Sequence, residues 1–301
     1  MKKALLFLFA INCGLLLIKS SVSGQTTTVF SDTFTSDSSL AAPPWYNLNN
    51  TSAAGYALNP TAGQGLALTV SSGTGKVNEM FAEFTPVTLT SGESVALTVN
   101  FNSPSGMATD TGGLLVGLYN NATVNSTNEQ GSAGGSTTTG GETAASQGYF
   151  GIMGYNTSAG TSTKFFSRQG GATDANELGY YSSQTAGSFT QLSTFAASGN
   201  AALSLNVNYT LTYTITDEGG ANLITANISN GSATLDNWTT TDASGLYDKF
   251  NQLDFGNYGK AGAVDINILS ESVVTEVPEP SVMALGGAAF GLLGLIRFHR
   301  R

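Results

Sequence analysis

Two glutamates with a spacing suited to acid–base chemistry lie in the segment Glu79-Met80-Phe81-Ala82-Glu83. In a β-strand the side chains of alternate residues share a face, so both carboxylates would project from the same side. A pair of carboxyl groups that flanks a glycosidic bond can act as acid and nucleophile in glycoside hydrolysis. The alternative is a solvated strand face whose opposite, inward side carries Met80, Ala82 and Phe84.

Residues 25–276 contain neither histidine nor cysteine, because Cys13 and His299 lie near the two ends of the chain. This composition excludes disulfides and zinc sites built on Cys or His. It also excludes every Ser-His-Asp or Cys-His nucleophile arrangement. We assign no catalytic residue and no bound cofactor to this region, and a carboxylate pair remains the alternative for catalysis.

Two aspartates offer a metal-binding hypothesis. Asp32 and Asp265 lie in the first and last predicted strands, which are often neighbours in jelly rolls, so their carboxylates could share a structural Ca²⁺. The alternative is a pair of edge carboxylates that face water or cap turns. Asp217 and Glu218 lie in a predicted turn, where acidic residues are ordinary. Because no EF-hand spacing occurs, we assign no metal ligand from the sequence.

Aromatic side chains give a carbohydrate-binding hypothesis, because flat rings stack on sugar faces. The candidates are Trp45, Tyr46, Trp238 and Tyr247, and Trp45 follows two prolines in a loop-like context. Packing in the core or at an interface is the alternative for each of them.

The central region is strongly acidic. It carries 19 acidic residues, which are the 20 of the chain less Glu279, and five basic ones, which gives 5 − 19 = −14. Such a surface repels phosphates, so nucleic acid is excluded as a partner. The basic residues are Lys76, Lys164, Arg168, Lys249 and Lys260.

Apolar residues recur with a period of two between clusters of Gly, Asn, Ser and Thr, a pattern that predicts β-strands. In residues 209–215 the odd positions are Tyr, Leu, Tyr and Ile and the even positions are Thr, which indicates one buried and one wet face. The predicted strands are Thr28–Phe34, Leu66–Val70, Glu79–Phe84, Ser94–Phe101, Leu114–Tyr119, Tyr149–Tyr155, Thr163–Arg168, Leu178–Tyr181, Thr190–Phe195, Tyr209–Thr216, Leu223–Ser229, Phe250–Phe255 and Val264–Val274.

Two connections stand out. Residues 217–222 carry turn residues between two clear strands and predict a hairpin. Residues 121–146 are nearly all Asn, Ser, Thr, Gly and Ala, too poor in apolar side chains to offset the entropy of ordering. We interpret them as a long mobile loop inside one domain, with a domain boundary as the alternative.

The C-terminal 25 residues have the form of a sorting address. Val277-Pro278-Glu279-Pro280 precede an uncharged apolar run, residues 281–296, and Arg297, Arg300 and Arg301 follow it. As a helix the run spans about 24 Å, a little less than a hydrocarbon core of about 30 Å. By the positive-inside rule the arginines stay cytoplasmic, so the rest of the protein lies outside the cytoplasm.

These three parts, in this order, resemble the PEP-CTERM sorting tail of Gram-negative bacteria. The resemblance implies anchoring in the inner membrane, processing near the Pro-Glu-Pro motif by an exosortase-type peptidase, and delivery to the cell surface or an exopolysaccharide matrix. A plain C-terminal membrane anchor is the alternative. Lys2, Lys3, the apolar stretch 4–18 and the small residues 21–24 predict a secretory signal peptide over residues 1–24.

About a dozen strands without helices predict an all-β, antiparallel two-sheet jelly-roll sandwich over residues 25–276, followed by one transmembrane helix over 281–296. The order resembles the concanavalin A-like or laminin-G-like jelly roll that often precedes PEP-CTERM tails. The resemblance is carried by residues 30–34, 113–119, 148–155, 250–255 and 264–268.

Glycosidases on this type of sandwich carry Glu, Asp and Glu on alternate residues of one strand, and here Phe81 takes the place of the Asp. The sequence therefore favours a non-catalytic exported protein that is structural, adhesive or glycan-binding, with polysaccharide as a further expected partner. A carboxylate-dependent glycan hydrolase is the alternative.

Overall fold

The computed structural model describes residues 24–34, 45–49, 55–58, 65–70, 76–107, 112–121, 145–157, 162–170, 189–259 and 263–278. These residues form two β-sheets, and every strand pair with a defined register is antiparallel. The predicted all-β fold with two antiparallel sheets is therefore confirmed. Residues 27–275 group as one compact unit.

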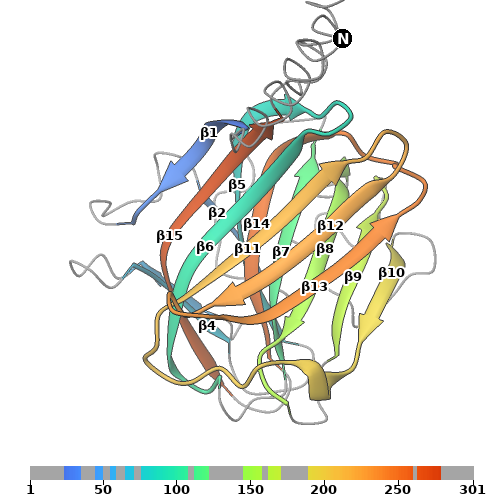
Figure 1. Cartoon of the computed structure of the whole chain (residues 1–301). Helices are drawn as coiled ribbons and strands as arrows, with labels where there is room; N and C mark the ends of the chain where they lie inside the picture. The colour runs from blue at the N-terminus through green and yellow to red at the C-terminus, as the bar shows by residue number, and fades with distance from the viewer. Residues whose placement is uncertain are drawn as a thin grey trace, which may run out of the picture. The chain divides into compact units, whose positions relative to one another are not determined.

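One sheet has eight strands, in the order β13-β12-β11-β6-β15-β4-β3, with β1 paired to β15 (Figure 1). Its strands are β1 (Gln25–Asp32), β3 (Gly55–Leu58), β4 (Leu66–Val70), β6 (Ser94–Ser105), β11 (Tyr209–Asp217), β12 (Asn222–Ser229), β13 (Thr234–Asp242) and β15 (Val264–Val277).

The other sheet has seven strands, in the order β10-β9-β8-β7-β14-β5-β2, and lies behind the first in Figure 1. Its strands are β2 (Trp45–Asn49), β5 (Lys76–Thr88), β7 (Gly113–Asn120), β8 (Gln147–Gly154), β9 (Thr163–Arg168), β10 (Phe189–Phe195) and β14 (Lys249–Gly259). The first and last strands, β1 and β15, are neighbours as the sequence predicted.

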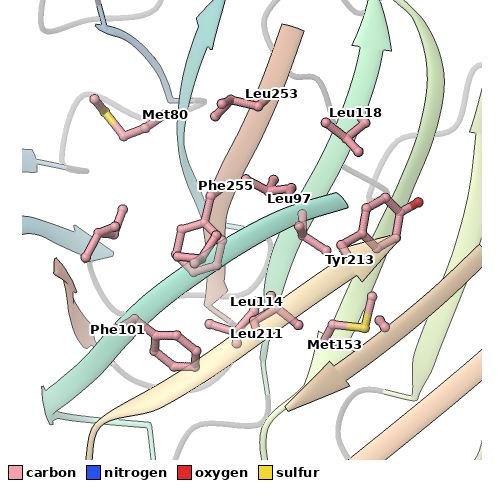
Figure 2. Close-up of a cluster of buried hydrophobic side chains, with 14 of the residues drawn as sticks. Met80, Leu97, Phe101, Leu114, Leu118, Met153, Leu211, Tyr213, Leu253 and Phe255 are labelled. Atoms are coloured by element: carbon pink, nitrogen blue, oxygen red, sulfur yellow. The ribbon is translucent and has the colours of Figure 1, made fainter. Parts of the chain in front are cut away.

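The core lies between the two sheets, where side chains from β6 and β11 meet those from β5, β7, β8 and β14. Figure 2 shows ten of its labelled members, all fully buried. They are Met80, Leu97, Phe101, Leu114, Leu118, Met153, Leu211, Tyr213, Leu253 and Phe255. Interdigitation of two apolar inner faces is how a sandwich removes apolar area from water.

Period-two alternation located the core strands well. In β11 the Tyr, Leu and Ile positions are buried and the Thr positions half-buried, as predicted. The predicted hairpin is confirmed, because β11 pairs with β12 in unbroken register from Thr210↔Ser229 to Asp217↔Asn222. The predicted strands Leu66–Val70 and Thr163–Arg168 have the observed bounds of β4 and β9.

Three strands were missed. Strand β13 points Asp236, Trp238 and Asp242 inward and several threonines outward, so its buried face does not read as apolar. Strands β2 and β3 are short and flanked by turn residues. The predicted extension of the first strand to Phe34 is wrong: β1 ends at Asp32, whose Oδ1 accepts the Phe34 N–H at 2.8 Å. Phe34 itself has a φ of 50°, which ends the extended conformation.

Several predictions fall outside the described residues. These are the strand at Leu178–Tyr181, nearly all of the signal peptide, the interior of the 121–146 loop, and the apolar run 281–296. Within the described ranges the 3₁₀ turn η2 spans Ala197–Gly199, and Ala145 also has 3₁₀ conformation. A search of those same ranges finds no helix long and apolar enough to cross a membrane.

Candidate functional site

Strand β14 carries Gln252 and Asp254 on the outer face of the seven-stranded sheet. Its intervening residues Leu253 and Phe255 belong to the core between the sheets, so the alternation of a strand turns Gln252 and Asp254 the other way. Both side chains are nevertheless fully buried. The outer face of this sheet is therefore a second interior, separate from the main core.

The register of β14 with its neighbours brings acidic residues together on this face. Asp254 stands opposite Phe81 of β5, and Gly256 stands opposite Glu79. Glu79 and Asp254 are therefore diagonal neighbours, a relation that places Cβ atoms about 7 Å apart in an antiparallel pair. Glu83 stands opposite Gln252. On β5, Phe81 lies between the two glutamates, Glu79 and Glu83. The carboxyl group of Asp254, on the neighbouring strand β14, stands opposite Phe81.

Aromatic and aliphatic side chains surround this polar group. Phe150 and Phe166 stack with centroids 4.8 Å apart, and Phe189 meets Phe150 edge-on. The guanidinium of the buried Arg168 lies 5.7 Å from the centre of the Phe189 ring, a cation–π distance. The buried apolar members of this cluster are Phe81, Leu115, Tyr119, Phe150, Ile152 and Phe166.

Glycines make room for the polar side chains. A Cβ on Gly117, which stands opposite Asp254, would lie 2.5 Å from the Tyr119 ring. A Cβ on Gly256 would lie 2.8 Å from Cγ of Glu79. The ring of Tyr119 and the side chain of Glu79 thus occupy the space that larger residues at 117 and 256 would fill.

The surroundings of Asp254 favour the protonated form of its carboxyl group. Burial raises its pKa well above the usual value, the negative charges of Glu79 and Glu271 raise it further, and Arg168 only partly opposes them. Neither carboxyl oxygen of Asp254 has a hydrogen-bond partner. The same is true of the Tyr119 hydroxyl, and burial raises the pKa of Tyr119 as well. A neutral acid and a neutral phenol are what a buried face with few donors can accommodate.

Two consecutive residues of β14, Asn251 and Gln252, bond to the two ends of the 121–146 segment. The Asn251 side chain accepts from the Asn121 N–H at 2.7 Å and donates to the Asn121 carbonyl at 3.0 Å. The Ser146 hydroxyl donates to Oε1 of Gln252 at 2.7 Å. Arg168 donates through Nη1 to the backbone carbonyl of Ser146.

The structure corrects one interpretation of the acidic residues on β5. Glu79 is fully buried, so the expectation of a solvated face for Glu79 is wrong, although Met80, Ala82 and Phe84 do face the core. Glu83 is half-buried. Burial arises because the outer face of this sheet is itself an interior, which period-two alternation cannot reveal.

The structure does not support a shared Ca²⁺ site for Asp32 and Asp265. Oδ2 of Asp32 accepts from Trp45 Nε1 at 2.8 Å, and its Oδ1 caps the turn at Phe34. Asp265 accepts from the hydroxyls of Thr69 and Ser105 instead. Each carboxylate thus accepts hydrogen bonds from residues near it, and Asp32 caps a turn, as the alternative to a shared metal site supposed. No group of three or more His, Cys, Asp or Glu side chains suited to a metal occurs among the described residues.

The aromatic candidates for sugar stacking are core residues. Trp45 and Trp238 are each 4% exposed and Tyr247 is 9% exposed. Trp45 packs edge-on against Phe30, which explains why a loop-like sequence context did not expose it. The side chain of Tyr46 lies outside the described residues.

Asp217 is the last residue of β11 and Glu218 follows it in the turn to β12, where Asp217 Oδ1 accepts the Gly219 N–H at 2.6 Å. Of the sorting motif, Val277 ends β15 and is 43% exposed, and Pro278 follows the strand. Glu279, Pro280, Arg297, Arg300 and Arg301 lie outside the described residues.

Sequence reasoning missed Asp254, Gln252, Tyr119 and Arg168. A signal for the first two was present, because 250–255 was predicted as a strand and alternation puts Gln252 and Asp254 on one face. Their proximity to Glu79 depends on the pairing of β14 with β5, which the sequence does not encode locally.

The outer face of the eight-stranded sheet differs in kind. Its side chains are half-exposed hydroxyls and amides that bond from strand to strand. Asn100 on β6 donates to Ser270 Oγ on β15 at 2.8 Å and accepts from Thr210 Oγ1 on β11 at 2.6 Å. Asn102 links Asn208 and Asn267 in the same way, at 3.0 and 3.1 Å. This face offers many uncharged donors and acceptors to water or to a ligand.

Searches for related proteins return no matching family model and no matching curated protein. Among solved structures, the chain is similar to the metal-free carbohydrate recognition domain of Emp46p, with 11% identity and a TM-score of 0.42 over 82% of this chain and 94% of that chain. It is also similar to the seed lectin of Lotus tetragonolobus, with 12% identity and a TM-score of 0.44 over 84% and 100% of the two chains. A third similar structure is lectin II from Ulex europaeus, with 10% identity and a TM-score of 0.42 over 85% of this chain and 100% of that chain.

Proposed function

We propose that this chain is an exported, non-catalytic protein of the bacterial cell surface or exopolysaccharide matrix, with a structural, adhesive or glycan-binding role. In this proposal residues 1–24 are a signal peptide, 25–276 a β-sandwich domain, and 277–301 a sorting tail with a transmembrane helix over 281–296. The tail holds the protein in the inner membrane until an exosortase-type peptidase processes it near Pro278-Glu279-Pro280.

The observation that carries the non-catalytic part is the burial of the acidic face. Glu79 and Asp254 are both 0% exposed, so a polymeric substrate has no access to the pair. Residues 25–276 hold no histidine or cysteine that could supply another nucleophile or base. The sandwich therefore offers a stable scaffold in which this pair of carboxyl groups is inaccessible.

The position of β15 supports the sorting part. The strand runs to Val277, where the Pro-Glu-Pro motif begins, so cleavage at the motif leaves every described strand intact. The test is the mass of the mature protein recovered from a host that contains an exosortase-type peptidase. An end near residues 278–280, lost when Pro278 and Pro280 are replaced by alanine, supports processing. A fully retained Arg301 on a protein in the cytosol contradicts it.

The hydroxyl- and amide-rich outer face of the eight-stranded sheet supports adhesion to a neutral polysaccharide, since it presents uncharged hydrogen-bonding groups on a strongly acidic protein. Binding to the exopolysaccharide of the host is measured by co-sedimentation. Thr212→Glu and Asn227→Glu, two half-exposed residues paired across β11 and β12, should reduce binding. Binding that these variants leave unchanged would remove this face from the proposal.

A carboxylate-dependent glycan hydrolase is the second candidate, and one observation favours it. Asp254 stands diagonal to Glu79 and its pKa is raised, and a carboxyl group of raised pKa beside a second one is the pairing that glycoside hydrolysis uses. A reducing-sugar assay against a panel of polysaccharides decides between the two. Turnover that is abolished by both Asp254→Asn and Glu79→Gln, and retained by Asp248→Asn, would replace the non-catalytic proposal.

A further inference from the structure

The hydroxyl of Ser146 and the amide of Gln252 form an unusual buried pair. Both residues are 0% exposed, and the hydroxyl donates to Oε1 of the amide at 2.7 Å. The amide nitrogen of Gln252, Nε2, has no hydrogen-bond partner. A buried amide N–H₂ without an acceptor is costly, and native proteins rarely keep one.

A second hydroxyl–amide pair in the same protein is fully bonded. The Thr163 hydroxyl donates to Oδ1 of Asn200 at 2.9 Å, and Nδ2 of Asn200 donates to the Asn156 carbonyl at 3.3 Å. Both residues of this pair are also buried. The two pairs therefore differ in the amide nitrogen. A hydrogen bond holds Nδ2 of Asn200, whereas no hydrogen bond holds Nε2 of Gln252.

We propose that Ser146 and Gln252 become joined by an intramolecular ester. The Ser146 O–H bond breaks and a bond forms between Oγ and Cδ of Gln252, while the Cδ–Nε2 bond breaks. The hydroxyl proton ends on the departing nitrogen, which leaves as ammonia, so the step needs no oxidant, reductant or other reactant.

The surroundings suit this reaction. Proximity replaces a bimolecular encounter, because the hydrogen bond already holds the two groups in contact. Arg168, which donates to the Ser146 carbonyl, places a cation beside the pair, where negative charge develops on Oε1 during attack. Exclusion of water protects the ester from hydrolysis once ammonia has left.

The bond would take the place of a disulfide in a domain that has no cysteine. It would join the residue preceding β8 to β14, two strands away in the sheet order, across the end of β7. It would also fix covalently the C-terminal end of the 121–146 segment, whose other end Asn251 holds by hydrogen bonds alone.

The test is peptide mapping of the full-length folded protein after denaturation and digestion with trypsin. Cleavage after Lys76, Lys164, Lys249 and Lys260 places Ser146 in the peptide 77–164 and Gln252 in the peptide 250–260. The expected product is one species with the summed mass of these peptides less one ammonia. Alkaline hydroxylamine should split it and leave a hydroxamate on residue 252, which distinguishes an ester from an amide.

Variants separate the reaction from folding. Ser146→Ala and Gln252→Met should each give two linear peptides, whereas Ser146→Thr, which keeps a hydroxyl, should restore the joined species. Thr163→Val removes the matched hydroxyl and should leave the joined species unchanged. Linear 77–164 and 250–260 peptides from the folded wild-type protein, with Gln252 intact, would overturn the proposal.

Discussion

Two buried groups of this protein contain the same kinds of side chain, an Asp, a Tyr and an amide, with opposite outcomes. In the group between the sheets, Tyr149 donates to Oδ2 of Asp242 at 2.8 Å and Asn222 donates to the Tyr149 hydroxyl at 2.8 Å. In the group on the outer face of the seven-stranded sheet, Asp254 and the Tyr119 hydroxyl have no hydrogen-bond partner.

The pKa values follow the number of donors. Burial alone would raise the pKa of Asp242, but hydrogen bonds from the hydroxyl and N–H of Ser244 and from Tyr149 outweigh it, so the pKa lies below the usual value. Asp254 is buried without such donors, and its pKa is raised. For Asp242 the donors aimed at the carboxyl group outweigh the effect of burial, whereas for Asp254 no donor opposes it.

The largest effect is expected from Asp242→Ala. The change leaves Tyr149 and the Ser244 N–H without their acceptor and should lower the free energy of unfolding by about 3 kcal/mol. Urea unfolding at neutral pH measures it, with Asp248→Ala, an exposed residue of the same turn, as the control. Because the pKa of Asp242 is depressed, its stabilisation is present above about pH 4 and is lost as the pH falls through the folded pKa. Equal costs for both variants would contradict this account of the bonded group.

Asp254→Asn should change the free energy of unfolding in the opposite direction, by stabilising the protein. A raised pKa costs stability as the pH rises above the unfolded value of about 4, and the cost levels off above the folded pKa. Removing the ionisable group should therefore raise the free energy of unfolding at neutral pH by about 2 kcal/mol and flatten its dependence on pH. Below about pH 4 wild type and variant should converge. A variant that is less stable than wild type at every pH would show that Asp254 has a partner that its present contacts do not reveal.

The smallest expected change in stability distinguishes Tyr149 from Tyr119. Tyr149→Phe removes a hydrogen bond on each side and should cost about 1–2 kcal/mol, whereas Tyr119→Phe removes a hydroxyl without a partner and should change stability by less than about 0.5 kcal/mol. Both rings stay, including the one that fills the space over Gly117. Thermal unfolding of the pair of variants measures the difference, and a larger loss for Tyr119→Phe would reverse the comparison.

Sequence patterns predicted only some of the strands that carry the hydrogen-bonded group of Tyr149, Asp242 and Asn222. Tyr149 and Asn222 lie in or beside predicted strands, but Asp236 and Asp242 point inward from β13, which was not predicted. A strand whose buried face contains two aspartates breaks the apolar alternation on which prediction rests. Its acids are tolerated because each finds donors, Ala201 N–H for Asp236 and Tyr149 and Ser244 for Asp242.

The sequence identified the two glutamates of β5, Glu79 and Glu83, but did not predict that Glu79 is buried. Glu79 and Glu83 do share a strand, but Glu79 is buried and its nearest acidic neighbour across the sheet comes from β14. Likewise Trp45 and Trp238, candidates for exposed stacking, are packed in the core.

The sequence by itself determined that this chain makes strands, that a strand such as β11 has one apolar face, that β11 and β12 form a hairpin, and that no disulfide or histidine chemistry is possible in residues 25–276. These are local properties, since alternation, turn residues and composition act within a few residues of one another. Only the tertiary structure decided that Asp254 meets Glu79 and that Ser146 meets Gln252. Both contacts join segments more than 100 residues apart, and they depend on which strands pair and in what register, which is settled when the whole sheet closes.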